Sequence, residues 1–137
     1  MPAGPEPLGF AYFARVKLVG YSIFGNHLRK RFAVKKPSAV VFGAARTLLG
    51  ILVGAGFVAL LGTIGIVRQD ERIFYVLLLP VRFGEWLFAI WLFFRHRTTL
   101  QPAMVRKQAL WGSVCSYALD IPAVISVFVL PGGAWIC

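Results

Sequence analysis

The chain has 137 residues, of which 58% are hydrophobic, and its mean hydropathy of +0.74 is too high for a water-soluble domain of this size. Its formal net charge of +10 at pH 7 is one that nucleic-acid-binding proteins share. The basic residues, however, cluster in two short loops beside apolar stretches, which favours a membrane surface and argues against a nucleic-acid partner. The length fits a single domain covering residues 1–137, with no room for a separate catalytic module.

Four long apolar stretches predict the elements of this domain. In chain order they are residues 8–28, 39–67, 73–94 and 109–130. A hydrocarbon layer about 30 Å thick takes roughly twenty helical residues to cross, and lipid accepts only helices or closed barrels. The sequence therefore predicts an all-α, polytopic integral membrane protein, with four transmembrane helices in a small bundle. Residues 8–28 are the weakest stretch because Arg15 and Lys17 interrupt it, and the alternative is a helix lying on the membrane surface.

The loops predict the orientation. Residues 29–38 and 95–108 together hold nine basic residues, whereas the second loop, residues 68–72, holds two basic and two acidic residues. The positive-inside rule therefore places both long loops in the cytoplasm and both termini outside a cell (inner) membrane, as a multi-pass protein. The first loop is expected either to contact anionic lipid headgroups or simply to fix the topology. The headgroup contacts would be Arg29, Lys30, Arg31, Lys35 and Lys36.

Charged residues lie deep inside three of the four stretches. At 1.5 Å per residue, Lys17, Arg82, Glu85 and Asp120 fall roughly 14 to 18 Å from the predicted outer boundary, close to the middle of the layer. Charge at that depth is rare and is a functional-site hypothesis by default, although a structural ion-pair network remains the alternative. We expect Asp120 and Glu85 to neutralise Lys17 and Arg82 in a polar core.

Helical spacing adds polar residues to this core. On the fourth stretch, Ser113, Ser116, Tyr117 and Asp120 follow the spacing i, i+3, i+4, i+7 and share one face. Arg82 and Glu85 are three residues apart, which lets them pair on one helix. The predicted intramembrane polar site comprises Lys17, Arg82, Glu85, Ser116, Tyr117 and Asp120.

Other features of the stretches are less specific. Arg46 lies about 10 Å from the inner edge of its helix and is expected to extend its side chain to the headgroups. Pro80 and Pro122 stand within two residues of a deep charge, as in the broken helices of transporters, although prolines are common in membrane helices. Gly50 and Gly54 form a GxxxG pattern, expected to pack against a neighbouring helix or to form a contact with a second copy or a partner membrane protein.

Signatures of enzymatic chemistry are lacking. The sequence contains no HExxH, no CxxC, no glycine-rich phosphate loop and no GxSxG, so we assign no catalytic residue, metal ligand or cofactor. His27 and His96 are interpreted as interfacial histidines, with a haem or metal site as a weak alternative. The favoured hypothesis is a non-enzymatic membrane protein that contacts lipids or a membrane partner. The alternatives are a proton- or ion-coupled transporter or channel using Glu85 and Asp120, and an intramembrane enzyme acting on a lipidic substrate.

Overall fold

Four α-helices and their connections make up the part of the chain that the computed structural model describes, residues 7–64, 71–96 and 99–126. The helices are α1 (Pro7–Arg31), α2 (Ala39–Ile64), α3 (Glu71–Phe94) and α4 (Pro102–Ser126). The described residues include no strand, so the predicted all-α architecture with four helices is confirmed. Residues 65–67 and 127–130 of the predicted stretches lie outside the described residues, as does most of the predicted second loop.

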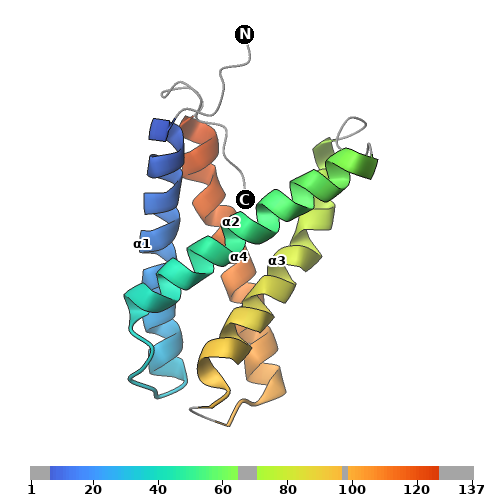
Figure 1. Ribbon diagram of the computed structural model, residues 1–137. Coiled ribbons are helices and arrows are strands. Elements are labelled where there is room, and N and C mark those ends of the chain that lie inside the picture. Colours follow the sequence, from blue (N-terminus) through green and yellow to red (C-terminus); the bar gives the residue numbers. More distant parts are fainter. Residues whose placement is uncertain (1–6, 65–70, 97–98, 127–137) are drawn as a thin grey trace.

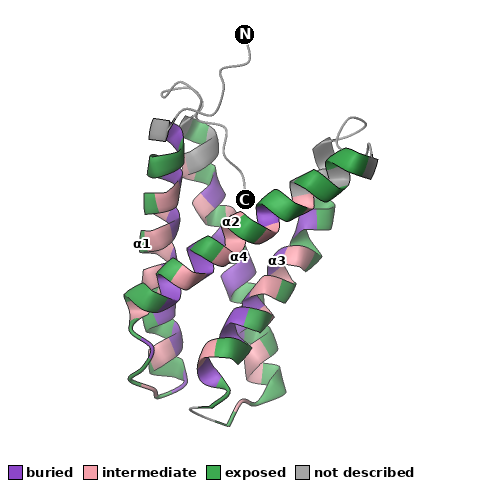
Figure 2. Cartoon of the chain, viewed as in Figure 1, coloured by how far each residue is buried: buried purple, intermediate pink, exposed green. Residues whose placement is uncertain are grey.

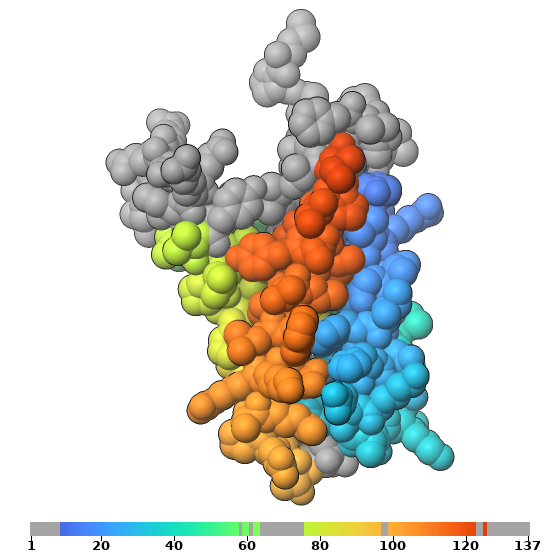
Figure 3. Space-filling model, turned by 180° about the vertical axis from the view of Figure 1, so that it is seen from behind, coloured from blue at the N-terminus to red at the C-terminus, as the bar shows by residue number. Residues whose placement is uncertain are grey.

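The helices run alternately up and down the bundle (Figure 1). Helix α1 packs on α2 and α4, and α3 packs on α4, while α2 crosses the bundle diagonally and packs far less on α3 than on α1. Seen from behind, α4 runs between α1 and α3 (Figure 3). The connections after α1 and α3 lie at the same end, which we call the basic end. Its basic residues are Arg29, Lys30, Arg31, Lys35, Lys36, Arg95, Arg106 and Lys107.

Local chemistry explains the helix boundaries at the basic end. Helix α1 ends where Ala33 takes a left-handed conformation (φ 52°), so that the N–H groups of Ala33 and Val34 donate back to carbonyls of its last turn at 3.3 and 3.0 Å. Ser38 caps α2 by accepting the N–H of Val41 at 3.2 Å. Pro102 opens α4, ahead of the predicted stretch 109–130, because a first-turn position needs no N–H donor.

Buried and exposed residues alternate along each helix (Figure 2), and the buried set includes several charged side chains. Lys17, Arg46 and Arg82 are at most 2% exposed, and Asp120 is 7% exposed. Large apolar side chains face outward from every helix instead. Examples, one from each helix, are Val19 (58% exposed), Leu52 (63%), Leu79 (54%) and Val114 (58%).

An aromatic core lies between the buried charges and the basic end. Trp86 is fully buried and packs edge-on against Tyr21 and Phe24, with ring centroids 5.5 and 4.9 Å apart. Its ring lies on the backbone of α4 at Gly112, where a Cβ would overlap the indole. The rest of this core is Leu28, Phe32, Phe42, Ala89, Ile90, Phe94 and Ala109.

Small residues allow α1 and α2 to approach closely, but at a different place from the predicted one. A Cβ on Gly43 would overlap the hydroxyl of Ser22, so the contact needs glycine at that position. At Gly50 the atom that a Cβ would meet is Nη1 of Arg46, on the same helix, at 3.1 Å. Close packing against α1 is therefore found at Gly43, and contact of Gly50 and Gly54 with another molecule stays a prediction.

Two helices contain segments that are long and apolar enough to cross a membrane. They are Ala39–Phe57 in α2 and Val76–Phe94 in α3. The polar and charged residues of α1 and α4 make these two helices less hydrophobic on average. Length and hydropathy thus distinguish α2 and α3 as the candidate spans.

Candidate functional site

Asp120 on α4 binds two cations from two other helices. Lys17 Nζ on α1 lies 2.5 Å from one carboxylate oxygen, and a guanidinium nitrogen of Arg82 on α3 donates to the other. The three side chains are each at most 9% exposed. Tyr117 is a fourth side chain of this group, because the Arg82 guanidinium lies 4.6 Å from the centroid of its ring. One carboxylate therefore links α1, α3 and α4.

Neutral hydrogen bonds extend this site toward the aromatic core. Lys17 Nζ also donates to the hydroxyl of Tyr21 and to the backbone carbonyl of Ser116, both at 3.3 Å. The Ser116 hydroxyl oxygen accepts two bonds, from the Tyr21 hydroxyl at 3.1 Å and from Trp86 Nε1 at 2.9 Å. Trp86 and Ser116 are both fully buried, so this bond satisfies an indole N–H that water cannot reach.

Glu85 has a different partner from the expected one. Its carboxylate accepts from Arg46 Nη2 at 2.5 Å, across the gap between α2 and α3. The Arg46 guanidinium also lies 4.9 Å from the ring centroid of Trp86 and 5.1 Å from that of Tyr21. Its Nε and Nη1 atoms are buried and have no hydrogen-bond partner among the described groups. The two rings give this cation a partial substitute for the missing partners.

The predicted polar residues do converge, but two of their predicted contacts are wrong. Arg82 does not pair with Glu85, because Arg82 faces α4 and Glu85 faces α2. Arg46 does not extend to the headgroups either, since it is 1% exposed and turned into the bundle. Lys17, Arg82, Ser116, Tyr117 and Asp120 surround one another as expected.

Three residues of the site are absent from the predicted one, namely Tyr21, Arg46 and Trp86. Arg46 was assigned to the membrane edge, and Trp86 was not considered. A signal existed for Trp86 and Tyr21, because they lie four residues after Arg82 and Lys17 and so share the faces of those residues, and a buried indole N–H needs an acceptor. Pro80 and Pro122 lie inside α3 and α4, and both helices continue past them.

The described charges at this site do not balance. Three cations (Lys17, Arg46 and Arg82) face two carboxylates (Glu85 and Asp120), which leaves a formal excess of one positive charge (3 − 2). Such a site repels an incoming cation, which would have to compete with the internal cations for either carboxylate. The arrangement is well suited to holding four helices in one register.

Metal chemistry has little support in the described part of the chain. No group of three or more His, Cys, Asp or Glu side chains is gathered there in a way that could hold a metal ion. The side chain of His96 accepts a bond from Arg95 Nε at 2.6 Å, and the ring of His27 lies 5.7 Å from that of Phe24.

Comparison of the chain with protein-family models, curated proteins and solved structures finds no match.

Proposed function

We propose that the protein is a non-enzymatic integral membrane protein that crosses the bilayer with all four helices and contacts lipids or a membrane partner through its outer surface. The observation that carries this proposal is the burial of charged side chains in a bundle whose outer surface is rich in large apolar ones. Buried Lys17, Arg46, Arg82 and Asp120 coexist with exposed large apolar side chains on every helix. In water that arrangement would expose far more apolar surface than soluble monomers tolerate. In lipid it is the favourable one.

The less hydrophobic helices α1 and α4 are part of this proposal. Lys17 of α1 and Asp120 of α4 pair with residues on other helices, so the polar faces that carry them turn inward. Arg15, the other charged residue in the outer half of α1, is exposed, and a long side chain at that position can extend to the headgroups. The outward faces of α1 and α4 carry apolar residues such as Ile23 (68% exposed) and Ile125 (56%). Mean hydropathy averages over both faces of a helix. For a helix that buries a charged face in a bundle, it therefore underestimates the hydrophobicity of the face that contacts lipid.

The buried network supports a structural role for the charges. Both carboxylates of the site, Glu85 and Asp120, are bound by internal cations, and the Asp120 site joins three helices. Transport of protons or cations through Glu85 and Asp120 is the alternative. It is less favoured because an entering cation would have to displace Lys17, Arg82 or Arg46.

Topology mapping tests the proposal directly. A reporter that is active only outside the cell is fused at Met1, and a reporter that is active only in the cytoplasm is inserted after Thr99, between α3 and α4. Four crossings predict activity of both fusions and retention of the protein in membranes washed with alkaline carbonate. A Met1 reporter located in the cytoplasm would mean that α1 does not cross, and release by carbonate would contradict the membrane proposal itself.

Neutral variants separate the structural role from transport. Glu85→Gln and Asp120→Asn are purified and incorporated into liposomes that contain a pH-sensitive dye. A structural network predicts lower stability of both variants and no proton or cation flux in the unaltered protein under any gradient. Flux in the unaltered protein, abolished in stable variants, would instead support transport.

A further inference from the structure

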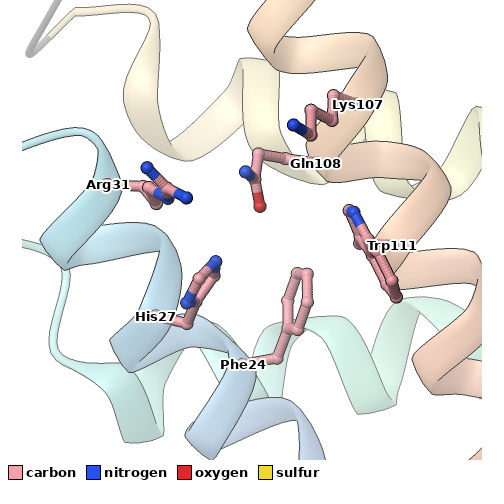
Figure 4. A pocket seen from close by; sticks show the side chains of 6 residues that line it. All are labelled: Phe24, His27, Arg31, Lys107, Gln108 and Trp111. Atoms are coloured by element: carbon pink, nitrogen blue, oxygen red, sulfur yellow. The ribbon is translucent and has the colours of Figure 1, made fainter.

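A pocket of about 490 Å³ opens between α1 and α4 at the basic end, away from the buried charges (Figure 4). Helix α1 contributes Phe24, His27 and Arg31, and helix α4 contributes Lys107, Gln108 and Trp111. Figure 4 shows side chains from both helices directed into one space. None of these residues takes part in the ion-pair network, so the pocket is a separate site.

The mouth of the pocket is positively charged. Arg31 stands in the last turn of α1, and Lys107 stands near the start of α4, both exposed. Figure 4 shows their charged groups on the same side of the pocket. Guanidinium and ammonium groups brought together in this way favour a phosphate group, which accepts several charge-assisted hydrogen bonds.

The wall of the pocket holds a polar group that lacks a partner. Gln108 is 4% exposed, and its Oε1 atom is buried without a hydrogen bond from any group in the described part of the chain. Figure 4 shows its amide directed into the space between the α1 and α4 side chains. A buried acceptor of this kind is normally satisfied, and a ligand that supplies a donor would satisfy it. A hydroxyl fits, whereas an ammonium would be repelled by Arg31 and Lys107.

The inner part of the pocket is apolar. On α1 the order toward the basic end is Phe24, His27, Arg31, and on α4 the order away from it is Lys107, then Trp111. Both helices therefore place aromatic rings deeper and cations nearer the end. An amphiphile with an anionic head and a hydrocarbon tail has the same order of groups when it lies in a bilayer leaflet.

We propose that this pocket binds one anionic phospholipid whose headgroup carries a free hydroxyl, as phosphatidylglycerol does. The phosphodiester lies between Arg31 and Lys107, and the first apolar groups of the lipid contact Phe24 and Trp111. The headgroup glycerol folds back beside the phosphate, so that its hydroxyl donates to Gln108 Oε1. This proposal depends on the proposed membrane location. It differs from general attraction to the basic loop because it requires one lipid held at one set of residues.

Native mass spectrometry of the full chain in detergent tests the site. Phosphatidylglycerol, phosphatidic acid and phosphatidylethanolamine are each added as the lipid, and glycerol 1-phosphate is added as the soluble phosphate ester. We expect one phosphatidylglycerol to bind with preference over phosphatidylethanolamine and to resist competition by glycerol 1-phosphate. Equal binding of phosphatidylethanolamine would overturn the proposal, and effective competition by glycerol 1-phosphate would identify a site for soluble phosphate esters instead.

Matched variants assign the binding to the pocket. The double variant Arg31→Gln, Lys107→Gln should weaken phosphatidylglycerol binding about 25-fold, or about fivefold for each charge removed. The control Lys30→Gln, Arg106→Gln removes the same charge at neighbouring exposed positions and should change affinity less than about twofold. Equal losses in the two variants would mean unspecific attraction and would contradict the proposal.

The Gln108→Leu variant tests the hydroxyl contact. It should reduce the preference for phosphatidylglycerol over phosphatidic acid, which lacks the headgroup hydroxyl, and an unchanged preference would contradict that contact. Failure here is distinct from failure of the proposed function. A chain that inserts in the membrane but shows no lipid preference overturns the pocket alone, whereas a chain released by carbonate overturns the membrane proposal.

Discussion

The two carboxylates in the middle of the bundle, Asp120 and Glu85, differ in how many helices depend on them. Asp120 binds two cations from two helices and lies beside hydrogen bonds that reach Tyr21 and Ser116. Glu85 binds one cation, Arg46, which keeps two aromatic rings as further neighbours. Residues of similar depth and charge can therefore differ in their importance for stability, because importance follows from the number of charges that would be left without a partner.

The largest effect is expected at Asp120. The Asp120→Asn variant leaves Lys17 and Arg82 buried without a counter-charge, and it should lower the free energy of unfolding by about 3 to 5 kcal/mol. Unfolding of the protein in mixed micelles by added SDS, followed by circular dichroism, measures this change. The triple variant Lys17→Met, Arg82→Met, Asp120→Leu should recover most of the loss, and no recovery would contradict a purely structural network.

A smaller effect is expected at Glu85. The Glu85→Gln variant leaves one cation, Arg46, without a counter-charge. The new amide can still accept a hydrogen bond from Arg46, so the loss of unfolding free energy should be about 2 kcal/mol. The same SDS titration provides the value. If Glu85→Gln proved as damaging as Asp120→Asn, the difference between the two sites would have no basis in their partners.

The hydroxyl of Ser116 tests the neutral part of the Asp120 site. Replacing Ser116 by Ala removes the acceptor of Trp86 Nε1 and of the Tyr21 hydroxyl and should cost about 1 to 2 kcal/mol of unfolding free energy. Trp86 fluorescence, isolated in a background with the other tryptophans replaced by Phe, should shift as its hydrogen bond is lost. The matched control is Ser113→Ala, whose hydroxyl donates only within its own helix, to Ala109 O at 2.9 Å. Equal costs would show that the bonds between helices add nothing.

A substitution remote from both carboxylates gives the smallest effect and the opposite sign. Ala33 adopts φ 52°, a conformation that glycine accepts without steric cost, so Ala33→Gly should stabilise the protein by about 1 kcal/mol. The changes in unfolding free energy caused by Ala33→Gly and Asp120→Asn should add in the double variant, because the two positions share no partner. A loss of stability on this substitution would contradict the helix-ending geometry after α1.

The sequence was sufficient for the helices and for the convergence of Lys17, Arg82 and Asp120. Apolar length gives the helices, and a fixed rise per residue gives the depth of a charge along each one. The spacing of residues gives the face of a single helix but not the neighbour that it meets. Arg82 and Glu85 are near one another on α3 and still point to different helices, and this depends on how α2 and α4 pack around α3.

The position of Arg46 and the pocket at the basic end were not predicted for related reasons. Depth alone allowed Arg46 to reach the headgroups, but the diagonal course of α2 turns that position toward Tyr21 and Trp86. Lys107 and Gln108 preceded the apolar stretch 109–130 and were assigned to a loop. Pro102, a good first residue of a helix, was the signal that α4 begins earlier and includes them.

Contact of all four outer helix faces with lipid is the property that distinguishes a four-span bundle from every other arrangement. Single spin labels are placed at Val19, Leu52, Leu79 and Val114, one on each helix, in liposomes, with the native cysteines replaced by Ser. Collision rates with oxygen, which concentrates in lipid, are compared with those of a water-soluble nickel complex. The account predicts that oxygen dominates at all four positions, whereas dominance of the nickel complex at Val19 or Val114 would show that α1 or α4 faces water and that the bundle does not cross the membrane four times.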